Sequence, residues 1–145
     1  MVDVGSKRIT RRVAIARGRL FVQRGTLEHL ASGATPKGNA LTTAHLAGVM
    51  AAKRTSELIP LAHPLPLDGV DLTFTPDPAT ASIGIEARVR CRGRTGVEME
   101  ALTAVTVAAL TLYDMLKAID RGMVIGEIAL WEKRGGRSGT YRRRP

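Results

Sequence analysis

The chain has 145 residues, of which 44% are hydrophobic, and this size and composition suit one globular domain with a hydrophobic core. No run of residues approaches the roughly 18 apolar residues of a membrane span, and the N-terminus lacks the apolar segment of a signal peptide, so we expect a cytoplasmic protein. The single cysteine, Cys91, excludes an internal disulfide framework and a cysteine-based zinc site.

The positive charge is concentrated at the two ends of the chain. The formal net charge is +9, from 22 Lys and Arg against 13 Asp and Glu. Residues 1–24 hold seven bases and one acid, residues 133–145 hold six bases and no acid, and residues 25–132 hold nine bases and twelve acids. Such a charge suits nucleic-acid binding, but aromatic residues make up only 3% of the chain, too few for base-stacking platforms. A small phosphorylated substrate held by the basic ends explains the charge equally well.

In chain order, the first half predicts a strand, a short helix and a longer helix, over residues 13–22, 27–32 and 40–58. Gly18 is a candidate bulge in the strand. Thr26 is expected to cap the start of the short helix, which Gly33 ends. A turn at residues 35–39 follows, and its last residue, Asn39, is expected to cap the longer helix.

The second half predicts a hairpin, a long helix and a last strand, over residues 70–74 with 82–91, about 98–119, and 124–132. This order of elements predicts an α+β, ferredoxin-like fold, with a four-stranded antiparallel sheet and helices on one face. The other face of that sheet is left uncovered, which suggests that subunits pack together. We expect one domain over residues 1–145, with a flexible basic tail from about residue 134.

The long helix carries the most informative polar residues. It is apolar almost all round, as is typical of a buried helix, and its few polar side chains form one stripe that includes Glu100, Asp114 and Lys117. A solvated surface pair would be the simpler explanation of an isolated Asp–Lys pair, but a thin polar stripe on so apolar a helix favours a functional role. Glu100 and Asp114 lie about 21 Å apart along one helix. Either the stripe serves two sites, or a neighbouring chain completes a site.

Three other features are candidates for substrate binding. Glu98 and Glu100 follow a glycine-rich turn, although acids there also stabilise the helix dipole. Lys37 lies in a turn that opens a helix, and the GGRSG segment near the C-terminus resembles a phosphate-binding loop without the full P-loop pattern. His63 lies in the proline-rich loop LIPLAHPLPL, where spacing alone favours a packed histidine over a catalytic one. No cluster has the spacing of metal ligands.

Five stretches carry a resemblance to a known family: MVDV, AAKRTSELIPLAHPLPL, TGVEMEALTAVTVAALTLYDMLKAID, MVIG and GGRSG. Together they resemble the molybdenum cofactor biosynthesis protein C family, the cyclic pyranopterin monophosphate synthases. The resemblance implies a lyase that converts 3′,8-cyclo-7,8-dihydroguanosine 5′-triphosphate, made from GTP by a radical enzyme, to cyclic pyranopterin monophosphate and diphosphate. It implies no cofactor, and leaves open whether Mg²⁺ accompanies the triphosphate. It also implies a homo-hexamer, a trimer of dimers with active sites at the dimer interfaces, and no membrane or nucleic-acid partner.

Carried over residue by residue, the resemblance assigns the catalytic pair to Asp114 and Lys117. It assigns the substrate contacts to Arg12, Lys37, Lys53, Leu61, Ala62, His63, Glu98, Met99, Glu100 and Lys133. Two positions depart from the family: many relatives have Cys in place of Ala62 and Asp in place of Asn39. The thiol of those relatives is therefore not expected to be essential in this chain.

The chemistry of the implied reaction matches these residue types. A carboxylate coupled to a lysine suits the proton transfers of ring opening and closure, so we expect Asp114 and Lys117 to form the acid/base unit. Four bases are expected to neutralise the phosphates: Arg12, Lys37, Lys53 and Lys133. Three other side chains are expected to hold the base-derived ring: Glu98, Glu100 and His63.

Two other functions compete with this interpretation. A basic RNA-binding module with a ferredoxin-like sheet predicts aromatic side chains on the open sheet face, where the sequence places none. A regulatory domain that binds a nucleotide without altering it is the other alternative.

Overall fold

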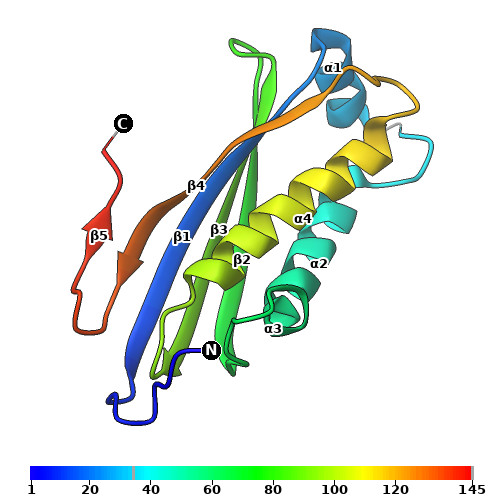
Figure 1. Ribbon diagram of the computed structural model, residues 1–145. Helices are drawn as coiled ribbons and strands as arrows, with labels where there is room; N and C mark the ends of the chain where they lie inside the picture. The colour runs from blue at the N-terminus through cyan, green and yellow to red at the C-terminus, as the bar shows by residue number, and fades with distance from the viewer. Residues whose placement is uncertain (34, 145) are drawn as a thin grey trace.

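Alternating apolar and polar residues build one antiparallel sheet, and helices pack on one of its faces (Figure 1). The computed structural model describes residues 1–33 and 35–144. The elements in chain order are β1 (Thr10–Phe21), α1 (Arg24–Ser32), α2 (Ala40–Lys53), α3 (Thr55–Leu58), β2 (Leu67–Asp77), β3 (Ser82–Gly93), α4 (Glu98–Leu116), β4 (Val124–Arg134) and β5 (Tyr141–Arg142).

The strand order, β2-β3-β1-β4-β5, confirms the predicted α+β, ferredoxin-like fold with one addition. Strand β5 pairs with the end of β4, so the sheet has five strands rather than four. The segment expected to be a flexible tail therefore carries a strand. Because β5 has only two residues and no alternating pattern around it, the free edge of β4 determines this strand rather than the local sequence.

The start of α1 differs from the prediction. The helix begins at Arg24, and the residue before it, Gln23, makes no capping bond with its side chain. Thr26 is therefore not the N-cap. It is only 2% exposed, and its hydroxyl donates to the buried carboxylate of Asp120 at 3.1 Å. This threonine ties α1 to the loop before β4.

The irregularity predicted at Gly18 lies in the neighbouring strand. Between the pairs made by Arg17 and Arg19, β4 contains one more residue than β1, and Glu127 of β4 has a left-handed φ of 54°. A Cβ atom at Gly18 would lie 2.7 Å from Cγ1 of Val105. The glycine thus allows α4 to approach β1 closely, and the bulge belongs to β4.

The predicted cap of the longer helix is confirmed. The side-chain oxygen of Asn39 accepts a hydrogen bond from the backbone N–H of Thr42 at 2.9 Å. The helix expected to reach residue 58 is, however, divided into α2 and the single turn α3. The proline-rich loop follows α3 and leads into β2.

Small residues let α2 and α4 pack closely along their length. Gly48 of α2 lies at a close approach, because a Cβ atom there would lie 3.1 Å from the backbone oxygen of Ala104 in α4 and 2.6 Å from Cδ2 of Leu72. The Cδ2 methyl of Leu72 can move alone, but the backbone oxygen of Ala104 cannot move without shifting the whole of α4.

Gly48→Val should therefore destabilise the fold by about 1–3 kcal/mol, the usual cost of overpacking a core. Denaturant unfolding at a fixed protein concentration measures this loss. Gly25→Val in α1 is the matched control, since no heavy atom lies within 4 Å of a Cβ atom at that position. Equal losses for the two variants would contradict the close packing of α2 on α4.

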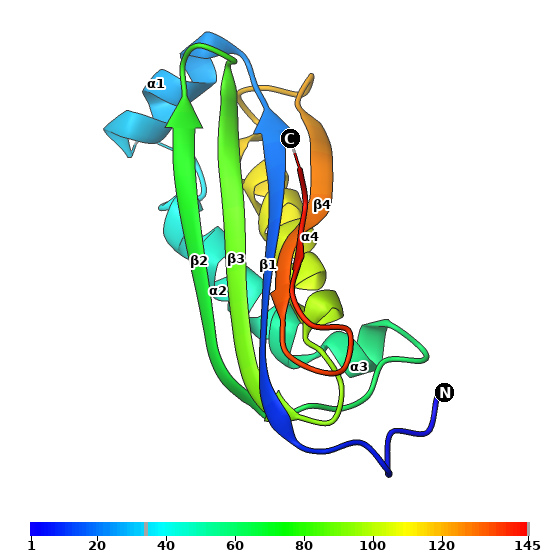
Figure 2. The same ribbon diagram turned by 90° about the vertical axis from the view of Figure 1, so that its left-hand side faces the viewer.

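The face of the sheet opposite the helices is open, as expected. Figure 2 shows strands β2, β3, β1 and β4 in front and the helices behind them. Charged side chains pair across this face: Arg17 contacts Glu86 at 2.6 Å, and Arg90 contacts Asp71 at 2.9 Å. The open face is therefore polar, unlike the core face.

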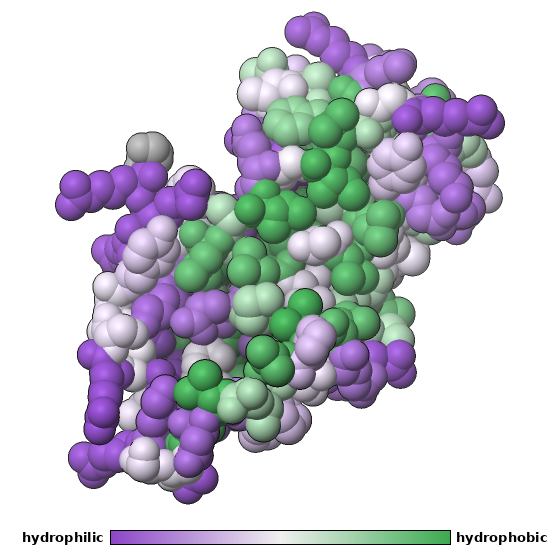
Figure 3. All heavy atoms as spheres, in the orientation of Figure 1, coloured by the Kyte–Doolittle hydropathy of each residue, from purple (hydrophilic) through white to green (hydrophobic). Residues whose placement is uncertain are grey.

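Apolar side chains are exposed on the helical face instead. Figure 3 shows them gathered over the course of α4. Helix α4 is long and apolar enough to cross a membrane, but about half of it is buried in the core, as in the central helix of a globular domain. We define the helix-face patch as the exposed residues Leu46, Met50, Met99 and Leu110. Such a patch marks a surface suited to contact with another subunit.

Candidate functional site

A cavity of about 570 Å³ lies where the N-terminal segment, the turn before α4 and the end of β4 meet; we call it the arginine cavity. Three residues with predicted roles, Arg12, Glu98 and Lys133, line it. Its other described lining residues are Ser6, Lys7, Arg8, Thr10, Arg94, Thr95, Gly96, Gly136, Arg137 and Ser138. The two basic ends of the chain thus come together at one cavity, as a phosphorylated ligand would require.

Arg12 is held rigidly at the wall of the arginine cavity. It is only 8% exposed, and its guanidinium donates to the backbone oxygens of Gly93 at 3.3 Å and of Arg94 at 3.2 Å. Gly136 packs directly on this guanidinium, with a left-handed φ of 78° that favours glycine. The GGRSG segment therefore forms a turn over Arg12, and its Ser138 accepts a hydrogen bond from Lys133.

A second cavity, of about 350 Å³, adjoins the first and contains the loop histidine; we call it the histidine cavity. Leu61 and His63 line it together with the N-terminal segment, and it shares Lys7 and Thr95 with the arginine cavity. One ring nitrogen of His63, Nε2, lies 2.9 Å from the backbone oxygen of Val2. The proline-rich loop and the first residues of the chain thus form one wall.

The predicted catalytic pair lies at the other end of α4. Asp114 contacts Lys117 at 2.8 Å through one carboxylate oxygen, and Lys37 at 2.6 Å through the other. We call these three residues the acid–lysine cluster. Hydrogen bonds from Lys117 and then Lys37 lower the pKa of Asp114 to about 2. All three side chains are about half exposed, so the cluster is open to a ligand or a partner subunit.

We expect the Asp114 carboxyl to titrate near pH 2, measured by the carbon-13 NMR shift of its carboxyl carbon. Its folded pKa lies below the ordinary value of 3.8, so its stabilising contribution is complete above that value and is lost as the pH falls through 2. Lys117→Ala and Lys37→Ala should each raise the midpoint. Arg121→Ala, an exposed base nearby, should not. A midpoint at or above 3.8 in the unaltered chain would contradict the paired geometry.

The two parts of the predicted site do not meet within one chain. Glu98 lies at the first turn of α4 and Asp114 near its last turn. Their separation of 16 positions along the helix corresponds to about 24 Å. The arginine and histidine cavities and the acid–lysine cluster are therefore separate half-sites, at opposite ends of α4.

Four predicted contact residues lie outside these three groups. Lys53 is exposed at the end of α2, and Met99 is 39% exposed beside the first turn of α4. Ala62 is half-buried in the proline-rich loop. Glu100 is only 4% exposed, and its burial, aided by the nearby negative charge of Glu98, raises its pKa. Glu100 is thus enclosed by the protein rather than open to either cavity.

Sequence reasoning missed several residues of the arginine cavity: Lys7, Arg8, Arg94 and Arg137. The concentration of bases at the chain ends was the only signal for Lys7 and Arg8, whereas Arg137 also lies in the GGRSG segment, which resembled a phosphate-binding loop. Arg94 gave none, because it lies in the glycine-rich turn before Glu98, to which no binding role was assigned. Asp120 was missed as well: it is 2% exposed and accepts from the backbone N–H of Gln23 at 2.8 Å, a structural role.

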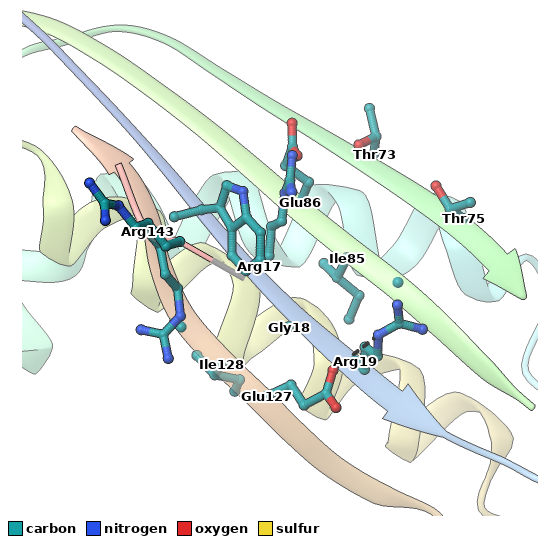
Figure 4. A pocket seen from close by; sticks show the side chains of 14 residues that line it. Arg17, Gly18, Arg19, Thr73, Thr75, Ile85, Glu86, Glu127, Ile128 and Arg143 are labelled. Carbon is teal, nitrogen blue, oxygen red and sulfur yellow. Dashed lines mark hydrogen bonds and ion pairs between the residues drawn. The ribbon is translucent and has the colours of Figure 1, made fainter. Parts of the chain in front are cut away.

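A further cavity, of about 870 Å³, lies on the open face of the sheet and contains no predicted site residue (Figure 4). Arg19 reaches Glu127 there at 3.1 Å. Trp131 also lines this cavity, with the Arg17 guanidinium 4.5 Å from its ring centroid. The expectation that the open face carries no aromatic side chain is therefore wrong for this one tryptophan, which already stacks on an arginine.

Within residues 1–33 and 35–144, no three His, Cys, Asp or Glu side chains lie close enough together to hold a metal ion. Cys91 is buried, and its burial, followed by the nearby charge of Glu100, raises the pKa of its thiol to about 11. Among the described residues, the ionisable groups open to a ligand are thus chiefly amines, guanidiniums and carboxylates.

Comparison with known proteins gives a consistent result. A family model described as the MoaC family matches residues 1–136. The cyclic pyranopterin monophosphate synthase of Chloroflexus aggregans is 60% identical over 143 residues, which cover 99% of this chain and 87% of that protein. The protein of the same name from Pelotomaculum thermopropionicum is 58% identical over 144 residues, which cover 99% of this chain and 85% of that protein. The one from Parvibaculum lavamentivorans is 55% identical over 142 residues, which cover 98% of this chain and 89% of that protein.

Proposed function

The chain belongs to the MoaC family, and from this premise we propose that it is a lyase of molybdenum cofactor biosynthesis. It converts 3′,8-cyclo-7,8-dihydroguanosine 5′-triphosphate to cyclic pyranopterin monophosphate with release of diphosphate. A radical enzyme acting on GTP supplies this substrate, and the reaction takes place in the cytoplasm. Nothing in the comparisons favours the RNA-binding alternative.

The observation that carries this proposal is the pair of adjoining cavities at the start of α4. The arginine cavity collects bases from both ends of the chain and suits a triphosphate. The histidine cavity beside it offers an apolar and a polar wall, Leu61 and His63, for the base-derived ring. Because the two cavities share Lys7 and Thr95, one ligand can occupy both.

The acid–lysine cluster supplies the proton transfers. Its paired lysines keep the Asp114 carboxylate charged at neutral pH, so Asp114 orients Lys117 rather than donating a proton itself. The ammonium of Lys117, 2.8 Å away, is the proton donor of the pair. Lys37 holds the other carboxylate oxygen and adds positive charge for the phosphates.

Glu98, at the rim of the arginine cavity, holds the polar edge of the ring system, and the exposed Lys53 and Met99 complete the site from the same end of α4. Leu61 and Ala62 shape its wall. No cofactor takes part; any Mg²⁺ arrives with the triphosphate.

The working enzyme is a homo-hexamer, a trimer of dimers, in which each active site joins two subunits. Three features support this assembly: the half-sites at opposite ends of α4, the exposed helix-face patch, and the open face of the sheet. A dimer that pairs the α4 helices in opposite directions would bring the acid–lysine cluster of one subunit to the arginine cavity of the other.

The experiment that tests this function is turnover of the cyclised dihydro-GTP by the purified protein, followed as diphosphate release and as formation of cyclic pyranopterin monophosphate. Turnover of this substrate is the expected result. A protein that binds the substrate but releases no diphosphate would be a binding module, and the proposed function would be wrong.

A further inference from the structure

The arginine cavity holds more positive charge than the family resemblance accounts for. Besides Arg12 and Lys133, its wall contains Lys7, Arg8, Arg94 and Arg137, against the single acid Glu98. In the described part of the chain, none of these six bases forms an ion pair with a carboxylate. Six bases and one acid leave a formal charge of +5 around one cavity. Cations gathered in this way repel one another until a multiply charged anion binds.

A buried hydroxyl points to the same ligand. Oγ1 of Thr10 is the one buried side-chain polar atom without a hydrogen-bond partner among the described residues. Thr10 is also a lining residue of the arginine cavity. Because buried polar groups in native proteins nearly always have partners, a rotation of this side chain towards the cavity would let the hydroxyl donate to an oxygen of a bound anion.

The GGRSG turn is shaped to close on that anion. Gly135, Gly136 and Gly139 all have left-handed φ values, of 97°, 78° and 65°, so the turn follows a course that favours glycine at three positions. This course carries Arg137 and Ser138 to the cavity. The N-terminal segment and the turn between β4 and β5 lie at the same end of the sheet in Figure 1. Arg137 lies just beyond the residues that the family model matches.

We propose that the arginine cavity binds the two terminal phosphates of the substrate through Lys7, Arg94 and Arg137, and that it retains free diphosphate as a product inhibitor. This inference rests on the proposed function. In the cyclisation step, a ribose-derived hydroxyl oxygen bonds to the α-phosphorus, and its proton passes to water. The bond from the α-phosphorus to the bridging oxygen breaks, and its electron pair leaves with diphosphate. Guanidiniums at the departing oxygens stabilise that charge and then hold the product.

Titration calorimetry with sodium diphosphate at constant ionic strength, without substrate, tests this proposal. We expect the unaltered protein to bind diphosphate more tightly than inorganic phosphate. Arg94→Ala and Arg137→Ala should each weaken diphosphate binding by about tenfold, since each removes charge-assisted hydrogen bonds. Both side chains are exposed, so neither change should disturb folding. Arg92→Ala is the matched control: it removes an exposed arginine two residues from Arg94 that does not line the cavity.

Diphosphate binding that is unchanged in Arg94→Ala and Arg137→Ala, or equally weakened in Arg92→Ala, would overturn the proposal. So would the absence of diphosphate binding to the unaltered protein. In turnover assays, added diphosphate should inhibit the unaltered enzyme and inhibit Arg137→Ala less. Turnover without diphosphate binding would refute this inference and leave the proposed function standing. Arginine-dependent diphosphate binding without turnover would refute the function and leave the diphosphate site standing.

Discussion

Replacement of Lys117 by Ala should lower turnover of the cyclised dihydro-GTP by at least about a hundredfold, the usual contribution of a general acid. The ammonium of Lys117 lies 2.8 Å from Asp114 and is the proton donor of the proposed pair. Diphosphate release in single-turnover experiments measures the loss directly. Because the side chain is half exposed, light scattering should show the same assembly for Lys117→Ala and for the unaltered chain.

Two further variants separate proton transfer from charge. Lys117→Arg keeps a cation beside Asp114, but a guanidinium does not release its proton at neutral pH, so this variant should be almost as inactive as Lys117→Ala. Arg121→Ala removes an exposed base four residues away and should retain turnover. Near-normal turnover of Lys117→Ala, or full activity of Lys117→Arg, would contradict the assignment of Lys117 as proton donor.

Mixed assemblies of two inactive variants should regain roughly a quarter of the unaltered activity, if each active site joins two subunits. Lys117→Ala disables the acid–lysine cluster, and Lys133→Ala disables the arginine cavity. In a random mixture half of the dimers contain one chain of each kind. Each of these dimers forms one site from two intact half-sites and one site from two altered ones. Co-expression of the two variants with different affinity tags, followed by turnover assays on the mixed oligomers, measures the recovery.

A second mixture is the matched control for this complementation. Lys117→Ala and Lys37→Ala both alter the acid–lysine cluster of a single chain, since both lysines contact Asp114. No mixed dimer of these two variants contains an intact cluster, so their mixture should stay inactive. Recovery in neither mixture would contradict the interfacial arrangement.

The pattern of side chains along the chain was enough to predict the layers and most of the secondary structure, although not β5 or the division between α2 and α3. Apolar and polar residues alternate along β2 and β3, and the apolar side chains face the helices. This alternation was readable from the sequence because the backbone alone sets the two-residue period of a strand. The near-continuous apolar character of residues 98–119 predicted a buried helix, and α4, which ends at Leu116, is central to the core. The cap at Asn39 is equally local, since its partner is three residues away.

Contacts between distant parts of the chain were decided only by the tertiary structure. Lys37 meets Asp114 across 77 residues, and His63 meets the backbone of Val2 across 61. No local period relates such residues, so neither the acid–lysine cluster as a triad nor the wall built by the N-terminal segment was predictable. The same reason explains why Thr26 was assigned to a cap, although its partner, Asp120, lies 94 residues further on.

The two basic ends of the chain illustrate both what composition predicts and what only the tertiary structure decides. Composition alone showed that bases are concentrated in residues 1–24 and 133–145, and it favoured a phosphorylated ligand as much as a nucleic acid. Only the antiparallel pairing of β1 with β4 brings these ends to one cavity, because it sets the start of one strand beside the end of the other. The sequence by itself therefore determined the charge and the elements that carry it. The register of the sheet decided where that charge is concentrated.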